Sequence, residues 1–208
     1  MNSISTKSPA FPYLSPKQSL KGLTFTFVMA LLVIVSISPH HASAEAQNCT
    51  NPPAELGNFR PESTPRASPV IPFFDIENNE RTISDYAGQG VVLNFWATWC
   101  APCIKEMPDL VRLKEILKDD KITVLALSED RKGAAKVVPF FLKQGIADLE
   151  VLIDKKGKVA RKSGVQGLPV TILIDPQGLE RGRVIGIAEW DHPDVVEFTR
   201  RCLGTPAS

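Results

Sequence analysis

The stretch Val91-Val92-Leu93-Asn94-Phe95-Trp96-Ala97-Thr98-Trp99-Cys100-Ala101-Pro102-Cys103 places two cysteines directly after a run of apolar residues. The run has the length and composition of a strand that is buried on both faces of a sheet. Residues 104–117 then keep apolar side chains at helical spacing, so we expect the cysteines at the start of a helix. Unpaired N–H groups and the dipole at a helix N-terminus stabilise a thiolate. The pattern predicts a reactive thiol at Cys100 and a second thiol, Cys103, that can close on it.

The sequence on both sides of this segment predicts alternating strands and helices. Asn78-Asn79 and Asp175-Pro176-Gln177-Gly178 are typical of hairpin turns. The expected elements are strands at 71–76, 80–83, 122–127, 150–153, 170–174 and 183–187, a turn or short helix from 84, and helices at 133–144 and 193–202. This order predicts an α/β fold with a central mixed sheet flanked by helices, an N-terminal β-hairpin extension and an inserted helix.

Length and charge limit the classes of function. The chain has 208 residues, of which 43% are hydrophobic, so it can form one ordinary domain. Lys and Arg total 24 and Asp and Glu total 23, without a basic patch, so we expect no nucleic-acid partner. Because nicotinamide and flavin motifs are also absent from the sequence, no cofactor is expected.

The N-terminal part of the chain predicts export. Residues 22–38 are uncharged, follow three lysines and lead into Ala42-Ser43-Ala44, which has the small-x-small form of a signal-peptidase site. The uncharged segment falls between a signal-peptide core and the roughly 20 residues that span a bilayer. Residues 1–44 are therefore a cleaved signal peptide or an uncleaved signal-anchor. Residues 45–69 contain five prolines and predict a linker before a folded domain at 70–204.

Cys49 and Cys202 lie near the two ends of the predicted domain. Since disulfides persist in exported proteins, we expect these two cysteines to form a structural bridge. Such a bridge closes a long loop and stabilises a fold by about 2–4 kcal/mol. Two free thiols are the alternative.

With Trp-Cys-x-Pro-Cys at 99–103 and Gly-Leu-Pro-Val-Thr at 167–171, the chain resembles the thioredoxin superfamily. The resemblance implies a thioredoxin-like fold, in which Pro169 is the cis-proline that faces the disulfide and holds the substrate chain. Pro108 matches the proline inside the active-site helix. An ordinary loop proline is the alternative for Pro169. The resemblance also implies a substrate-binding surface formed by Trp99, Ala101, Pro102 and Leu168.

Asn94 stands where thioredoxin itself has a buried aspartate, so another proton acceptor is needed. In the branch that includes TlpA, ResA and the cytochrome c maturation reductases, an acid stands three residues after the second cysteine. This chain has Glu106 there, and residues three apart on a helix share a face. The resemblance therefore implies that Glu106 is the proton acceptor for Cys103. A solvated surface glutamate is the alternative. Within the branch, the spacer, the helix from 133 and the extra cysteines favour the TlpA type.

The resemblance implies thiol–disulfide exchange outside the cytoplasm, with Cys100 as the attacking thiolate and Cys103 as the resolving thiol. Ala101 and Pro102 carry no cation, which favours reduction of partner disulfides over oxidation or isomerisation. The implied clients are copper-centre assembly proteins of cytochrome oxidase or apocytochrome c. The implied electron donor is a membrane thiol transporter of the DsbD/CcdA kind. We expect a monomer that is periplasmic, secreted or anchored to the periplasmic face of the inner membrane.

A metal-binding protein and a peroxidase are the rival interpretations. Sco-like copper metallochaperones also have a thioredoxin fold, but they separate their cysteines by three residues, whereas two separate Cys100 from Cys103. His192 could complete a copper site, although a helix-cap histidine is the simpler interpretation. A structural zinc site needs four ligands and no second cysteine pair follows, so no metal is expected. The residues before Cys100 lack the Pro-x-x-x-Thr-x-x-Cys pattern of a peroxidatic cysteine.

Overall fold

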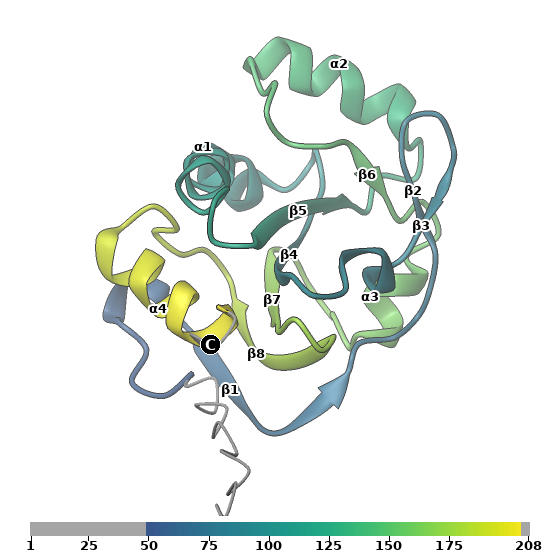
Figure 1. The fold of residues 1–208 in the computed structure, drawn as a ribbon. Helices are drawn as coiled ribbons and strands as arrows, with labels where there is room; N and C mark the ends of the chain where they lie inside the picture. Colours follow the sequence, from purple (N-terminus) through teal and green to yellow (C-terminus); the bar gives the residue numbers. More distant parts are fainter. Residues whose placement is uncertain (1–48, 205–208) are drawn as a thin grey trace, which may run out of the picture. The chain divides into compact units, whose positions relative to one another are not determined.

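The computed structural model describes residues 49–204, which contain one mixed sheet of eight strands in the order β1-β8-β7-β4-β5-β6-β2-β3 (Figure 1). The strands are β1 (Phe59–Ala67), β2 (Phe73–Phe74), β3 (Glu80–Arg81), β4 (Gly90–Trp96), β5 (Ile122–Ser128), β6 (Leu152–Ile153), β7 (Val170–Ile174) and β8 (Leu179–Ile185). The helices are α1 (Ala101–Ile116), α2 (Ala134–Gln144), α3 (Lys158–Lys162) and α4 (Pro193–Leu203), with 3-10 turns η1 (Ala54–Leu56) and η2 (Ile83–Tyr86). The predicted fold class is confirmed.

Strand β4 lies at the centre of the sheet, parallel to β5 and antiparallel to β7. All its residues are buried, as the apolar run predicts, and successive side chains enter opposite layers of the core. Val92 and Trp96 pack with residues of α1, α2 and α4, whereas Val91, Leu93 and Phe95 pack with residues of η2, α3 and β2. The strand is thus covered on both faces, and its buried C-terminal end directly precedes the cysteine motif.

The prediction that residues 45–69 form a linker is wrong for most of that range. Residues 45–48 lie outside the described part of the chain, but η1 and β1 are folded elements, and β1 pairs antiparallel with β8. Leu56 and Phe59 are buried, and the Phe59 ring packs edge-on against Phe198 of α4 at 5.1 Å. β1 tolerates prolines because it is an edge strand, where some N–H groups need no partner. The Phe59 ring packs against Gly182 of β8, and a Cβ added at Gly182 would lie 2.4 Å from this ring.

The other elements differ from expectation only in detail. β8 begins at Leu179, four positions before the predicted strand, because its charged side chains conceal the apolar pattern. Glu180 is buried there and accepts hydrogen bonds from Arg66 at 3.1 Å and Arg183 at 2.7 Å. The short helix α3 was not predicted. Asp154, which precedes α3, accepts the backbone N–H groups of Lys158 and Ala160 at 2.8 and 3.0 Å.

Cys49 and Cys202 are joined by a disulfide with their Cα atoms 4.6 Å apart. Both side chains are buried, and Cys202 lies on α4. The bond therefore attaches the segment that precedes η1 to the last helix.

The predicted signal peptide or anchor, residues 1–44, lies outside the described part of the chain. Within residues 49–204, none of the helices combines the length and hydropathy needed to cross a bilayer.

Candidate active site

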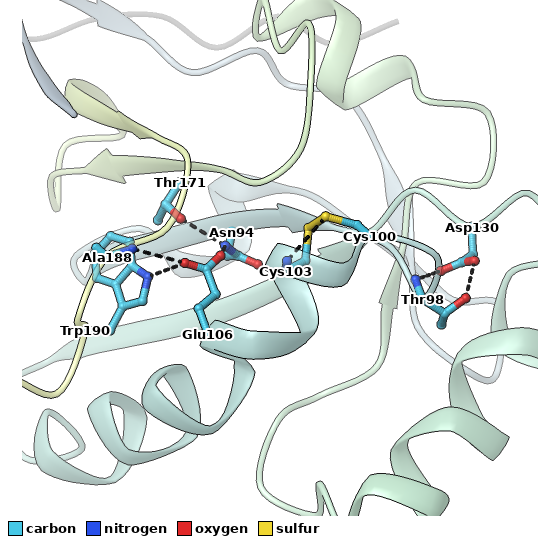
Figure 2. Close-up of a disulfide and its surroundings, with 9 residues drawn as sticks. All are labelled: Asn94, Thr98, Cys100, Cys103, Glu106, Asp130, Thr171, Ala188 and Trp190. Carbon is cyan, nitrogen blue, oxygen red and sulfur yellow. Dashed lines mark hydrogen bonds between the residues drawn. A yellow bond between two sulfur atoms is a disulfide. The ribbon is translucent and has the colours of Figure 1, made fainter. Parts of the chain in front are cut away.

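Cys100 and Cys103 form a disulfide between the end of β4 and the first turn of α1, with Cα atoms 5.3 Å apart (Figure 2). Cys100 is the N-cap of α1, and its sulfur accepts the backbone N–H of Cys103 at 3.3 Å. Cys100 is 5% exposed and Cys103 is fully buried, whereas Trp99 is 70% exposed. Both cysteines are therefore buried in the disulfide form, and they differ in that Cys100 lies at the helix N-terminus and keeps a small exposed area.

Asp130 holds the loop that leads into the cysteine pair. Its carboxylate accepts the backbone N–H of Thr98 at 2.8 Å, the hydroxyl of Thr98 at 2.7 Å and the hydroxyl of Ser128 at 2.9 Å. Asp130 follows β5, whose last residue, Ser128, is the register partner of Trp96. Sequence reasoning missed this residue, although the C-terminal ends of neighbouring parallel strands meet at one edge of a sheet.

Glu106 lies three residues after Cys103 on α1 and is buried, with 2% of its surface exposed, so it is not a solvated surface glutamate. Oε2 accepts the indole N–H of Trp190 at 3.0 Å and the backbone N–H of Ala188 at 3.4 Å, and Oε1 accepts Nδ2 of Asn94 at 3.0 Å. Burial raises the pKa of Glu106 to about 7, although these three hydrogen bonds act in the opposite direction. A carboxyl group with this pKa can take up and release a proton near neutral pH.

Asn94, on β4, links Glu106 to the neighbouring strand β7. Its Nδ2 also donates to Oγ1 of Thr171, its register partner, at 2.9 Å. Both side chains are buried, so these polar groups are shielded from water. Sequence reasoning noted Asn94 only as a departure from thioredoxin, and it missed Thr171 and Trp190 because they come from distant parts of the chain.

The Leu168–Pro169 peptide bond is cis and directly precedes β7. Val170, the next residue, is the register partner of Phe95, so β7 begins at the edge of the sheet where β4 ends. Pro169 is therefore placed at the same edge as the cysteine motif. Of the predicted substrate-binding residues, Trp99, Ala101 and Pro102 are exposed and Leu168 is half-buried.

His192 caps α4, where its Nδ1 accepts the backbone N–H of Asp194 at 3.4 Å. Within residues 49–204, the one group of three or more His, Cys, Asp or Glu residues with ligand atoms within 4.8 Å of one another is Glu55, His192 and Asp194. His192 therefore groups with two surface carboxylates and not with the cysteine pair. This arrangement agrees with the helix-cap interpretation and gives no support to a Sco-like copper site.

A sequence profile of the AhpC/TSA family matches residues 66–180, a stretch that includes both cysteines of the motif. The chain belongs to the AhpC/TSA family. Thiol-disulfide oxidoreductase ResA of Bacillus thuringiensis subsp. konkukian is 38% identical over 113 residues, which are 54% of this chain and 64% of the relative. ResA of Geobacillus thermodenitrificans is 35% identical over 134 residues, which are 62% of this chain and 75% of that relative.

A solved structure of similar fold is the putative thiol:disulfide interchange protein DsbE from Chlorobium tepidum. It is 28% identical, has a TM-score of 0.60, and aligns with 68% of this chain and 99% of its own. These relatives confirm the thioredoxin-like fold and the placement of this AhpC/TSA family member in the TlpA/ResA-like branch. The match to the first relative spans less than two thirds of that relative's length.

Proposed function

We propose that the protein is an extracytoplasmic thiol-disulfide oxidoreductase that mainly reduces disulfides of partner proteins through Cys100 and Cys103. The observation that carries this proposal is the asymmetry of the pair: Cys100 caps α1 and is 5% exposed, while Cys103 lies within the helix and has no exposed surface. Glu106, the proposed proton acceptor for Cys103, lies three residues further along the same helix. The names of the relatives support the same activity.

In the reduced protein, the Cys100 thiolate attacks a partner disulfide, forms a mixed disulfide and releases one partner thiolate. The N–H of Cys103, which already points at the Cys100 sulfur, stabilises the negative charge of the thiolate. Cys103 then gives its proton to Glu106, and its sulfur attacks the Cys100 sulfur. The second partner thiolate leaves. The partner has gained two electrons, and the Cys100–Cys103 disulfide has formed.

The client is proposed to dock on the exposed side chains beside Cys100, namely Trp99, Ala101 and Pro102, with the half-buried Leu168 and the backbone at the buried Pro169 on the β7 side. An exposed strand-like segment of the client could hydrogen-bond to the backbone there. Copper-centre assembly proteins and apocytochrome c remain the proposed clients, and a membrane thiol transporter of the DsbD/CcdA kind remains the proposed reductant. The export signal expected in residues 1–44 supports the extracytoplasmic location.

The test is to replace Cys103 with Ser, which removes the resolving thiol and should leave clients attached to Cys100. Mixed disulfides should accumulate in cells with Cys103→Ser and should be absent from the matched variant Cys100→Ser. Wild-type protein, recharged with a dithiol, should also reduce insulin, and either cysteine variant should lose this activity. The proposal is overturned if Cys103→Ser traps no protein and the wild type reduces no disulfide.

A further inference from the structure

The Asn94 side chain carries a buried acceptor that lacks a donor. Both N–H bonds of its Nδ2 are used, one by Glu106 and one by Thr171. Its Oδ1 is shielded from water and meets no hydrogen-bond donor among residues 49–204. An unsatisfied buried carbonyl costs about 1–3 kcal/mol, so its persistence calls for a physical reason.

The orientation of this amide is fixed by its neighbours. While Glu106 is ionised it only accepts hydrogen bonds, so the Asn94 atom that faces it is then the nitrogen, as observed. The oxygen is therefore turned away from Glu106, and Figure 2 shows it on the side of the side chain that faces Cys103. In the disulfide form, the Cys103 sulfur has no hydrogen to donate.

We propose that reduction supplies the missing donor: the S–H of Cys103 donates to Oδ1 of Asn94, so that one amide joins the resolving thiol to Glu106. This inference rests on the proposed function, because it describes the reduced state of the same pair. It makes Asn94 a positioning residue that acts through Cys103 and Glu106.

Proton transfer reverses the polarity of both neighbours of the amide. One proton leaves the Cys103 sulfur and ends on Glu106, and no electron moves in this step. The protonated Glu106 then needs an acceptor, and the Cys103 thiolate needs a donor. Rotation of the Asn94 amide by half a turn satisfies both groups, because Oδ1 then faces Glu106 and Nδ2 faces the thiolate.

Thr171 can accompany either orientation of the amide. Its hydroxyl accepts from Nδ2 in the observed orientation, and the same hydroxyl can donate to Oδ1 after the rotation. An aspartate at position 94 would instead place a second carboxylate against Glu106 and raise the cost of ionising either group. An amide at position 94 of β4 is thus compatible with a proton acceptor on α1, namely Glu106.

The test uses Cys100→Ser, in which Cys103 is the one free thiol, since the other two of the four cysteines are bonded to each other. The infrared S–H stretching band should lie at the lower frequency of a hydrogen-bonded thiol. Adding Asn94→Leu should move the band to higher frequency. Because Asn94→Leu also removes the donor to the thiolate, the thiolate fraction, measured by ultraviolet absorbance, should fall about tenfold at a fixed pH.

Thr171→Val is the matched control, because it removes a partner of the same amide but leaves Oδ1 and Nδ2 in place. It should keep the S–H band near its position in the parent variant. If Asn94→Leu does not fold, nuclear magnetic resonance of the wild-type Asn94 amide should show a large shift between the oxidised and the reduced protein. An unmoved S–H band and thiolate titration in folded Asn94→Leu, or an unmoved amide resonance, would overturn the inference. None of these measurements involves a client, so they test the hydrogen bond of Asn94 independently of the proposed exchange activity.

Discussion

Replacing Glu106 with Gln should change how the stability of the oxidised protein depends on pH. Burial raises the pKa of Glu106 from 4.5 to about 7, so the folded state holds this proton more tightly than the unfolded state. The stabilisation is fully present below the unfolded pKa and is lost as pH rises through the folded pKa. At about 1.36 kcal/mol per pH unit, the loss between pH 4 and pH 8 is about 3 kcal/mol.

The assay is urea unfolding of the oxidised wild type and Glu106→Gln at pH 4 and pH 8, with both disulfides intact. Between pH 4 and pH 8, the free energy of unfolding should fall by about 3 kcal/mol more in the wild type than in the variant. The variant should fold, because the Gln side-chain N–H can donate to Oδ1 of Asn94 once the Asn94 amide has rotated by half a turn. Glu115→Gln removes an exposed carboxyl from the same helix and serves as the control. An equal pH dependence in the wild type and Glu106→Gln would refute the reasoning.

Three further outcomes follow from the site and the fold. Glu106→Gln should slow the resolution of a mixed disulfide about 100-fold, as expected for loss of a general base, and stopped-flow measurements across pH would detect it; an unchanged pH–rate profile would contradict the role. Phe59→Ala should destabilise the domain by about 3–5 kcal/mol in urea, whereas a linker residue would cost almost nothing. The double variant Cys49→Ser/Cys202→Ser should lose about 2–4 kcal/mol yet still reduce insulin; loss of exchange in a folded variant would show that this bridge is more than structural.

The central part of the fold could be predicted from the sequence because its signals are local. The apolar run of β4 and the helical spacing of α1 are each contained in a single segment, and the cysteine motif lies between them. Glu106 could be found because the resemblance implies an acid three residues after Cys103, and this spacing on a helix places both on one face. β1 was missed because its prolines suit both a linker and an edge strand, and the two are distinguished by its pairing with β8 and the burial of Phe59.

The surroundings of Glu106 could not be predicted, because they are assembled by the sheet. Trp190 is 84 positions from Glu106, and Thr171 is 77 positions from Asn94. No periodic pattern in a sequence connects residues at such separations. The position of Asn94 could be compared with that of the thioredoxin aspartate, but its unsatisfied oxygen becomes visible only when every neighbouring donor is placed.

The hydrogen bond between Trp190 and Glu106 also gives the molecule an intrinsic optical probe. The chain has three tryptophans, of which Trp99 is exposed while Trp96 and Trp190 are buried. Trp190 donates its indole N–H to Glu106, whereas the buried indole N–H of Trp96 meets no acceptor among residues 49–204. In a Trp99→Phe background, changes in emission would therefore report the charge on Glu106 during turnover. The proton could then be followed in real time without an added label.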